Sequence, residues 1–302
     1  MARRKKGLDV DGILLLDKPL GISSNSALQR ARHLFNAKKA GHTGSLDPLA
    51  TGVLPICFGQ ASKVTSYLLD SDKSYTCTAQ LGVTTTTGDK EGDILRETTV
   101  SAFTKHDVEK VLSKFRGNIQ QIPPMHSALK HNGQPLYKLA RQGIEIERKA
   151  RDVIIHDLTL VETTDSTITL NVKCSKGTYI RTLAQDIGNA LGFGAHLSML
   201  RRTEVSPFDC TTIVTLEQIE EYAALGELNK LLLPIDSALI HLPAITLSDE
   251  ESKRIQNGLK VSRHDIPKKN MIKLYLETGQ FIGIGRYSSD QCLAPKRLMR
   301  TN

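Results

Sequence analysis

The chain contains 302 residues, of which 39% are hydrophobic and 24% are charged, proportions that are typical of a folded globular protein and exclude a disordered one. Lys and Arg number 40 against 32 Asp and Glu, and the resulting charge of +8 favours a polyanionic partner such as a nucleic acid. No apolar run approaches the roughly 18 residues of a membrane-spanning helix. The five cysteines are scattered and form no C-x-x-C pair, which argues against a metal centre or a disulfide framework and favours a reducing, cytoplasmic compartment.

Secondary structure is predicted from the period of apolar residues and from helix caps. In chain order the prediction is a strand at 12–17, a helix from Ser23 or Ser24 to about Ala37, an irregular loop at 41–52, a strand at 74–84, a helix from Thr104 to Phe115, an antiparallel pair of strands at 153–161 and 167–175, a helix from Tyr179 to Leu191, capped helices after Thr215 and Ser248, and strands at 271–276 and 280–287. These helices and strands follow one another without a regular βαβ repeat. The expected fold is therefore α+β, with a mixed, mostly antiparallel sheet and flanking helices.

Composition changes at two places along the chain. Residues 123–151 open with two prolines and carry six basic residues against two acidic ones, which predicts an exposed basic insertion. The succession of predicted helices and strands begins again after Pro234. We therefore expect one large domain at 1–239, containing this insertion, and a small β-rich domain at 240–302.

The loop at 41–55, GHTGSLDPLATGVLP, is the first candidate for chemistry. Asp47 lies in it between Gly and Pro residues, five positions after His42, and loops on a rigid scaffold often carry catalytic groups. Pro48 restricts the backbone of Asp47 to extended geometry, which fixes where its carboxylate points. From spacing alone, an Asp-Pro turn or an Asx cap without a catalytic role is favoured over catalysis.

A second candidate is the segment 176–181, KGTYIR, at the predicted junction of a strand and a helix. Arg181 could pair bidentately with a carboxylate such as Asp47 and keep it ionised. Tyr75 could stack on a base, although a Tyr on an alternating strand is more often part of a core. No P-loop, HExxH or GxSxG motif is present, so the sequence gives no indication of a nucleotide or metal cofactor.

Taken together, these segments resemble a known family. GILLLDKP at 12–19, the loop at 41–55, Lys73-Ser74-Tyr75, KGTYIR at 176–181 and LSMLRR at 197–202 occur in this order, as in the bacterial tRNA pseudouridine-55 synthase (pseudouridine synthase B) family. The resemblance covers nearly the whole chain and weakens beyond 240. It implies cofactor-free isomerisation of a uridine in the tRNA T-loop.

The resemblance also implies roles for individual residues. Asp47 is expected to be the catalytic carboxylate, Tyr75 to pack on the target base and help move the C5 proton, and Arg181 to pair with Asp47. The residues expected to line or support the substrate pocket are His42, Tyr179, Leu200 and Lys18. The insertion at 123–151 is expected to clamp RNA, and the tail to form a PUA-like RNA-binding domain. The expected partner is tRNA, bound by a cytoplasmic monomer without a guide RNA or a membrane.

Other functions fit parts of the same pattern. A non-catalytic RNA-binding protein shares the basic charge but has no need for Asp47. A small-molecule glycosidase uses a similar carboxylate but has no need for a basic insertion. A relative that depends on a guide RNA is disfavoured because the chain lacks charged tails. The chemical route at C1′ also stays open among attack by Asp47 on C1′, addition to C6, and removal of a ribose proton.

Overall fold

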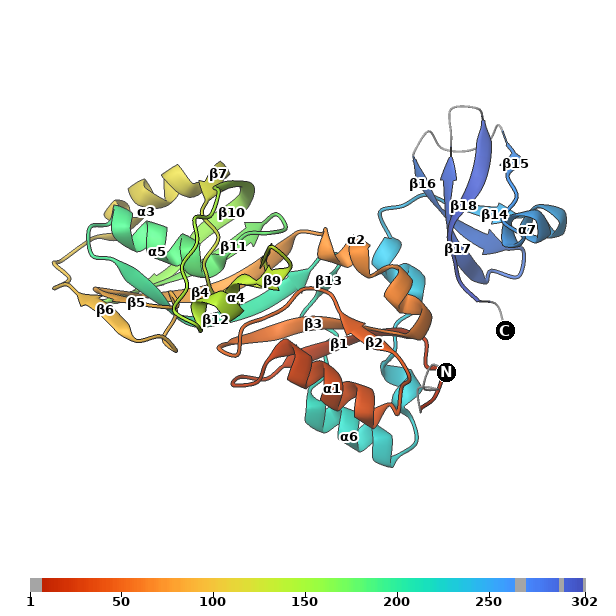
Figure 1. The fold of residues 1–302 in the computed structure, drawn as a ribbon, viewed down its shortest axis with the longest axis horizontal. Coiled ribbons are helices and arrows are strands. Elements are labelled where there is room, and N and C mark those ends of the chain that lie inside the picture. Colours follow the sequence, from red (N-terminus) through yellow and green to blue (C-terminus); the bar gives the residue numbers. More distant parts are fainter. Residues whose placement is uncertain (1–6, 264–269, 288–290, 301–302) are drawn as a thin grey trace.

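The computed structural model describes residues 7–263, 270–287 and 291–300. The molecule is elongated, with a nine-stranded sheet that forms most of its length and a five-stranded sheet set apart at one end (Figure 1). Neighbouring strands of the large sheet are antiparallel except for one parallel pair. This arrangement confirms the expected α+β fold with a mixed, mostly antiparallel sheet.

The large sheet has the strand order β1-β3-β12-β4-β11-β10-β7, while β2 pairs with β3 and β13 pairs with β12. Its strands are β1 (Gly12–Lys18), β2 (Ala40–His42), β3 (Ala50–Phe58), β4 (Lys73–Leu81), β7 (Gly117–Gln121), β10 (Arg151–Thr163), β11 (Thr167–Cys174), β12 (Ala195–Val205) and β13 (Phe208–Asp209). The parallel pair is β3 with β12. This pair lies near the middle of the sheet and joins its two halves.

Helices cover the two halves of the sheet separately. The α-helices are α1 (Ser24–Leu34), α2 (Thr65–Leu69), α3 (Lys105–Leu112), α4 (Leu136–Ala140), α5 (Ile180–Ala190), α6 (Leu216–Ala224) and α7 (Asp249–Gln256), and the 3-10 turns are η1 (Gly59–Lys63), η2 (Ser113–Phe115), η3 (Leu228–Leu231) and η4 (Ile235–Leu239). Helices α3 and α5 pack on β4, β10, β11 and β12, and helices α1 and α6 pack on β1 and β3. The predicted caps are confirmed at Ser23, Thr104, Thr215 and Ser248.

Strands β1 and β3 are buried on both faces. Leu14 and Leu16 pack towards α1, while Ile13 and Leu15 pack towards α2 and η4. Burial on both faces explains why this part of the chain has a continuous apolar run rather than alternation.

The prediction of an irregular loop over 41–52 is wrong at both of its ends. The beginning of this segment pairs as β2, and the end opens β3. Gly52 and Pro55 lower the strand propensity of this segment, but tertiary pairing overrides that preference. Gly52 has φ +98°, and a Cβ atom on it would clash with the carbonyl oxygen of Arg202. The close contact between β3 and β12 therefore requires a glycine here.

Between the paired strands β7 and β10 the chain leaves the sheet. Residues 122–150 form a short hairpin of β8 (Lys130–His131) and β9 (Gln134–Pro135), followed by α4, so the last residue of the predicted insertion, Arg151, already belongs to β10. Their small core consists of Met125, Leu136 and Leu139. A second hairpin, β5 (Val83–Thr85) with β6 (Ile94–Glu97), projects from the end of β4.

The C-terminal sheet has its own core. Its order is β14-β16-β17-β18-β15. The strands are β14 (Ala244–Leu247), β15 (Val261–Ser262), β16 (Met271–Leu276), β17 (Phe281–Tyr287) and β18 (Cys292–Leu298). The residues of its core are Leu247, Ile255, Val261, Ile272, Leu274, Ile282 and Leu293. Among the described residues, no helix is long and apolar enough to span a membrane.

The contact at Gly52 gives a test of the fold. We expect Gly52→Ala to lower the free energy of unfolding by more than about 3 kcal/mol, because the added Cβ atom meets a backbone carbonyl and the positive φ is strained. Gly21→Ala is the matched control, since Gly21 also has positive φ but no atom within 4 Å of the added Cβ. We expect it to cost only about 1 kcal/mol. Urea unfolding followed by circular dichroism measures both, and equal losses would contradict the proposed contact.

Candidate active site

Asp47 is held by a loop that is anchored on both sides. The buried hydroxyl group of Ser24 accepts a hydrogen bond from the Leu46 N–H at 2.7 Å and donates one to the Leu46 carbonyl at 3.0 Å. Leu46 and Leu49 are themselves buried. The Pro48 carbonyl accepts a bond from the Gly21 N–H at 2.9 Å. These contacts fix the backbone, so the carboxylate of Asp47, with 42% of its side chain exposed, is directed into a cavity.

Lys18 lies beneath this loop. Its side chain is fully buried, and Nζ donates to the carbonyls of Pro19 at 2.8 Å, Ile22 at 2.7 Å and Pro48 at 3.5 Å. Burial lowers the pKa of Lys18 to about 8, while the negative charge of Asp47 opposes this shift. Lys18 is not among the residues that line the cavity. The arrangement fits its predicted supporting role and does not support a direct contact with substrate.

The cavity has a volume of about 570 Å³ and brings the other predicted residues together. From the predicted set it is lined by His42, Asp47, Tyr75, Tyr179, Arg181 and Leu200. The remaining lining residues are Gly44, Ser45, Leu46, Leu69, Lys73, His126, Ser127, Ala128, Ser175, Gly177, Thr178, Ile180 and Arg202. The segments that meet here are separated by up to about 160 positions in the sequence, as the pair Gly44 and Arg202 illustrates.

Arg181 is buried in the wall of the cavity, beside Asp47. Its Nε lies 3.0 Å from Oδ2 of Asp47, and Nη1 lies 3.6 Å from Oδ2 of the buried Asp89. The terminal nitrogens donate to two backbone carbonyls, Nη1 to Thr87 at 2.8 Å and Nη2 to His126 at 2.7 Å. The predicted bidentate pairing with Asp47 is therefore wrong. The terminal nitrogens hold neighbouring segments instead, and Nε makes the contact with the carboxylate.

The electrostatic balance at Asp47 differs from the prediction. Burial raises the pKa of Asp47 above its ordinary value, and the charge of Asp89 adds to this shift. Arg181 is the main opposing influence, with smaller contributions from Lys18 and His126. Pairing with Arg181 thus reduces the effect of burial but does not cancel it.

Tyr75 and Leu200 form neighbouring parts of the wall. Tyr75 on β4 is the register partner of Arg202 on β12, and Leu200 on β12 is the register partner of Cys77 and Ala50. Burial raises the pKa of the Tyr75 hydroxyl, and the Arg202 guanidinium opposes this shift through a hydrogen bond and its charge. A phenol and an aliphatic side chain at this depth suit a flat, partly polar ligand such as a nucleobase.

Two polar groups of the cavity have no partner. Within the described residues, three buried side-chain atoms lack a hydrogen bond, and two of them belong to the lining residues His42 (Nδ1) and Ser127 (Oγ). Burial and the nearby Arg202 lower the pKa of His42, so its imidazole is neutral at pH 7. Buried polar atoms in native structures are nearly always bonded. Both atoms are buried, so they lie within the wall of the cavity rather than on its open face.

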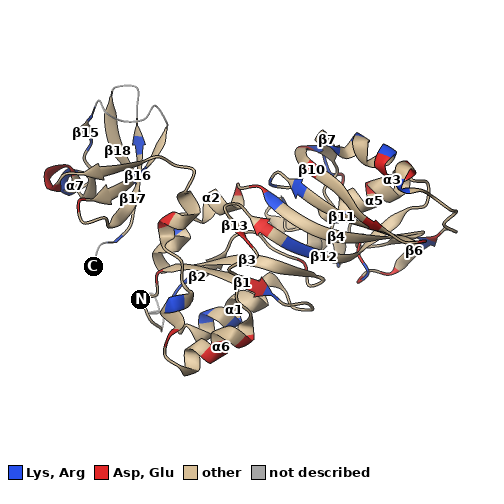
Figure 2. Cartoon of the chain, turned by 180° about the vertical axis from the view of Figure 1, so that it is seen from behind, with Lys and Arg blue, Asp and Glu red and all other residues tan. Residues whose placement is uncertain are grey.

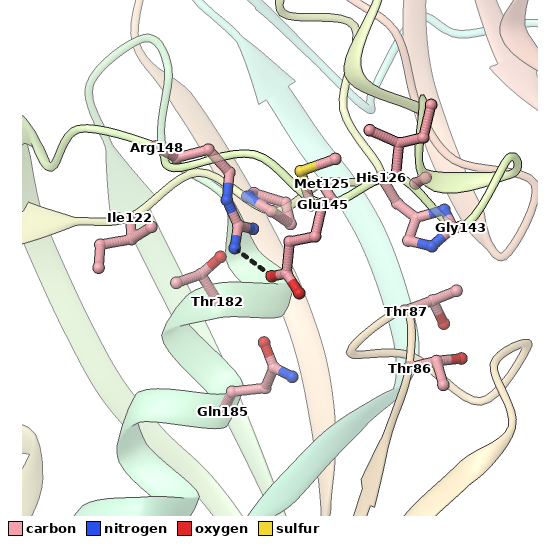
Figure 3. A pocket seen from close by; sticks show the side chains of 13 residues that line it. Thr86, Thr87, Ile122, Met125, His126, Gly143, Glu145, Arg148, Thr182 and Gln185 are labelled. Carbon is pink, nitrogen blue, oxygen red and sulfur yellow. Dashed lines mark hydrogen bonds and ion pairs between the residues drawn. The ribbon is translucent and has the colours of Figure 1, made fainter. Parts of the chain in front are cut away.

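A second cavity of about 350 Å³ lies behind Arg181, between the insertion and α5. Figure 3 shows Glu145 and Arg148 of the insertion facing each other above Thr182 and Gln185 of α5. Arg148 pairs with Glu145 at 2.8 Å and also donates to the carbonyls of Ile146 and Pro123, which ties the two ends of the insertion together.

The two cavities share His126, whose carbonyl accepts from Arg181. Thr87, the other carbonyl partner of Arg181, also lines the second cavity. The position of the insertion is therefore linked to the position of Arg181.

Sequence reasoning assigned no role to Asp89, His126, Lys73 or Arg202. Lys73 and Arg202 belong to the motifs at 73–75 and 197–202, but nothing in the local sequence around His126 marks it as part of this site. Within the residues that the structure describes, no group of three or more His, Cys, Asp or Glu is arranged to hold a metal ion. The ionisable side chains that line the cavity are thus one carboxylate, two buried guanidinium groups, one lysine, two phenols and two imidazoles.

Three family models match consecutive parts of the chain. They are the TruB family pseudouridylate synthase N-terminal domain over residues 32–180, the tRNA pseudouridylate synthase B C-terminal domain over 181–240, and the pseudouridine synthase II TruB C-terminal domain over 243–299. The chain is 51% identical over 295 residues to tRNA pseudouridine synthase B of Pseudomonas aeruginosa (strain UCBPP-PA14). It is 53% identical over 296 residues to the protein of the same name from Pseudomonas fluorescens (strain Pf0-1). Both alignments cover 97% of each chain.

Solved structures share the fold. A chain of a Cbf5-Nop10-Gar1 complex superposes with a TM-score of 0.72 at 27% identity, covering 91% of this chain and 78% of that chain. A chain of an H/ACA RNP bound to a substrate RNA containing 2′-deoxyuridine superposes with a TM-score of 0.74 at 21% identity, covering 100% and 92%. At 21% identity, the second comparison shows a shared fold and nothing more.

The charges around Asp47 give a second test. We expect Asp47 to titrate above the ordinary range of an aspartate, because burial disfavours the carboxylate. Arg181→Met should raise this pKa further, since it removes a positive charge, and Asp89→Asn should lower it, since it removes a negative charge. Carbon-13 NMR titration of labelled aspartate carboxyl groups measures all three proteins. If the pKa of Asp47 is the same in all three proteins, the described contacts are contradicted.

Proposed function

The chain belongs to the TruB family of pseudouridylate synthases, and from this premise we propose that it converts uridine 55 in the T-loop of tRNA to pseudouridine, with Asp47 as the catalytic carboxylate. The observation that carries the proposal is the position of Asp47, which contacts Arg181 in a cavity walled by Tyr75 and Leu200. Isomerisation of a uridine needs one well-placed carboxylate and a pocket that retains the detached base.

The reaction replaces the bond between C1′ and N1 of uracil with a bond between C1′ and C5. No atoms are added or removed overall. In the route that resembles a retaining glycosidase, a carboxylate oxygen of Asp47 bonds to C1′ as the C1′–N1 bond breaks, and its electron pair stays on N1. After the ring turns, C5 bonds to C1′, the carboxylate leaves, and the proton on C5 is lost while N1 is protonated. Addition of Asp47 to C6 and removal of a ribose proton are the two other routes that suit a carboxylate at this place.

The other lining residues have roles that follow from their positions. Tyr75 packs on the base and helps to move the C5 proton, and Arg181 orients Asp47 and limits the rise in its pKa. Neutral His42, Tyr179 and Leu200 contact the flipped nucleotide. Extrusion of a stacked base costs on the order of a few kcal/mol, which contacts between the protein and the RNA backbone must offset.

Several surfaces are available for those contacts. Lys and Arg are spread over α1, α3 and the C-terminal sheet rather than confined to one element (Figure 2). We propose that the insertion at 123–151 clamps the RNA and that residues 240–302 form a PUA-like RNA-binding domain attached to a catalytic domain at 1–239.

We further propose that the protein acts in the cytoplasm as a monomer on tRNA alone. The two aligned Pseudomonas relatives carry tRNA in their names and share about half of their residues with this chain, which supports tRNA over a guide-dependent substrate.

Tritium release tests the proposed chemistry, because the proton on C5 must leave. We expect the wild-type protein to release tritium from C5-labelled uridine in an unmodified tRNA transcript, and Asp47→Asn to do so at least about a thousand-fold more slowly. Asp165→Asn, in the exposed turn between β10 and β11, should match the wild type. Equal release by wild type and Asp47→Asn, or equal turnover of free uridine and tRNA, would refute the proposal.

Charge removal tests the clamp. Replacing Lys130, Lys138 and Lys149 with Gln should weaken tRNA binding and reduce the slope of log Kd against log salt by about two to three, because each phosphate contact releases counterions. These lysines are exposed. Filter binding across a salt series measures the effect.

The matched control replaces three exposed lysines at α3 and the turn after it, Lys105, Lys110 and Lys114, with Gln. It removes the same charge elsewhere on the surface. Equal slopes for the two triple variants would exclude a specific clamp.

A further inference from the structure

Arg202 is a buried guanidinium whose place in the site is distinct from that of Arg181. It lies on β12 with 1% of its surface exposed and lines the cavity that contains Asp47. Its sequence neighbour Arg201 pairs instead with both carboxylate oxygens of Asp17, at 3.0 and 2.9 Å. The strand thus carries two adjacent arginines that face different surroundings.

Backbone carbonyls anchor the Arg202 side chain. Its Nε donates to the Val53 carbonyl at 2.7 Å, and its Nη2 donates to the Gly44 carbonyl at 3.2 Å. Gly44 belongs to the loop that carries Asp47, and Val53 belongs to β3. On the other side, Tyr75 is the direct register partner of Arg202 on β4, both side chains line the cavity, and the charge of Arg202 opposes the rise in the pKa of the Tyr75 hydroxyl. The guanidinium is therefore fixed between the loop of Asp47 and Tyr75.

The charge of Arg202 has no carboxylate partner among the described residues, whereas Arg181 contacts Asp47 and Asp89 and Arg201 contacts Asp17. A buried, unpaired charge is costly, and two carbonyls can be satisfied by a neutral donor without that cost. We therefore expect the charge of Arg202 to act on a group in the cavity. The ionisable group that acts on this charge from the paired strand is the hydroxyl of Tyr75.

We infer that Arg202 is a positioning residue that acts through Tyr75, holding its hydroxyl group against the target base and keeping a positive charge beside its oxygen. This inference rests on the proposed isomerisation at Asp47 and adds a residue to it. Val53 and Gly44 fix the guanidinium, and the guanidinium fixes the phenol. The ring of Tyr75 then stays in one orientation while the detached base turns over it.

A double-mutant cycle tests this inference. We expect Arg202→Gln to slow single-turnover tritium release from tRNA on the order of 100-fold at saturating enzyme, the scale seen for loss of one oriented donor. The Kd for tRNA should change less than about threefold. In a Tyr75→Phe background, Arg202→Gln should cause almost no further loss, because its effect passes through the missing hydroxyl. If the rate loss of the double variant equals the product of the two single losses, the inference is overturned.

Control variants separate this result from other failures. Arg201→Gln removes the same charge one residue away and should leave the rate near that of the wild type. If Arg202→Gln does not fold, Arg202→Lys replaces it in the same cycle, since Lys keeps the charge but loses the planar fork. Failure of the wild-type protein to release tritium would refute the proposed function itself. Normal wild-type release with an additive cycle would refute only the role of Arg202.

An independent measurement does not require activity. Ultraviolet titration of tyrosine, with the Tyr75→Phe signal subtracted, reports the ionisation of Tyr75. Arg202→Gln should raise the pKa of Tyr75 further, because the positive charge that opposes the effects of burial, Cys174 and Asp47 is lost. An unchanged Tyr75 titration would show that Arg202 does not act on the phenol.

Discussion

One buried guanidinium connects the parts of this active site. Arg181, at the start of α5, contacts Asp47 through Nε while its terminal nitrogens hold the carbonyls of Thr87 and His126. Those three partners come from the Asp47 loop, the turn after β5 and the basic insertion. Because the terminal nitrogens are already bonded to carbonyls, the guanidinium cannot rotate to meet the carboxylate bidentately without breaking those bonds. The orientation of Asp47 therefore depends on the segments around it, and RNA that contacts the insertion also contacts an element bonded to Arg181.

The charged groups of the same site are not paired one to one. Burial raises the pKa of Asp47 despite its contact with Arg181, and Arg202 has no carboxylate partner among the described residues. Among the described residues, His42 and Ser127 each carry a buried polar atom that makes no hydrogen bond of good geometry. A site of this kind is stabilised when a polar, partly charged ligand enters, and a flipped uridine with its phosphate neighbours has that character. Packing in the core of the large sheet stabilises the fold enough to hold these unfavourable charges in place.

Local signals in the sequence predicted the local features of the structure. The caps at Ser23, Thr104 and Thr215 depend on residues three positions apart, and the structure confirms them. Strand β3 was missed because Gly52 and burial on both faces hide the alternation that marks a strand. In β12 the charged Arg202 is buried and the apolar Met199 is exposed, so polarity does not reveal its faces. The Asp47 loop was visible from its Gly and Pro residues, but its role came from resemblance to a family. The contributions of Asp89, His126 and Arg202 depend on contacts between distant segments, and no local pattern encodes them.

The most direct test of the account is a crystal structure of the Asp47→Asn protein bound to an unmodified T-stem-loop RNA. The substitution keeps the shape of the side chain and stops the chemistry. We expect the target uridine to be flipped into the cavity, with C1′ within about 3.5 Å of the Asn side chain at position 47 and the base against Tyr75. A target uridine that stays stacked in the RNA, or that binds outside the cavity lined by Arg181 and Leu200, would contradict the central claim that this cavity is where the uridine is isomerised.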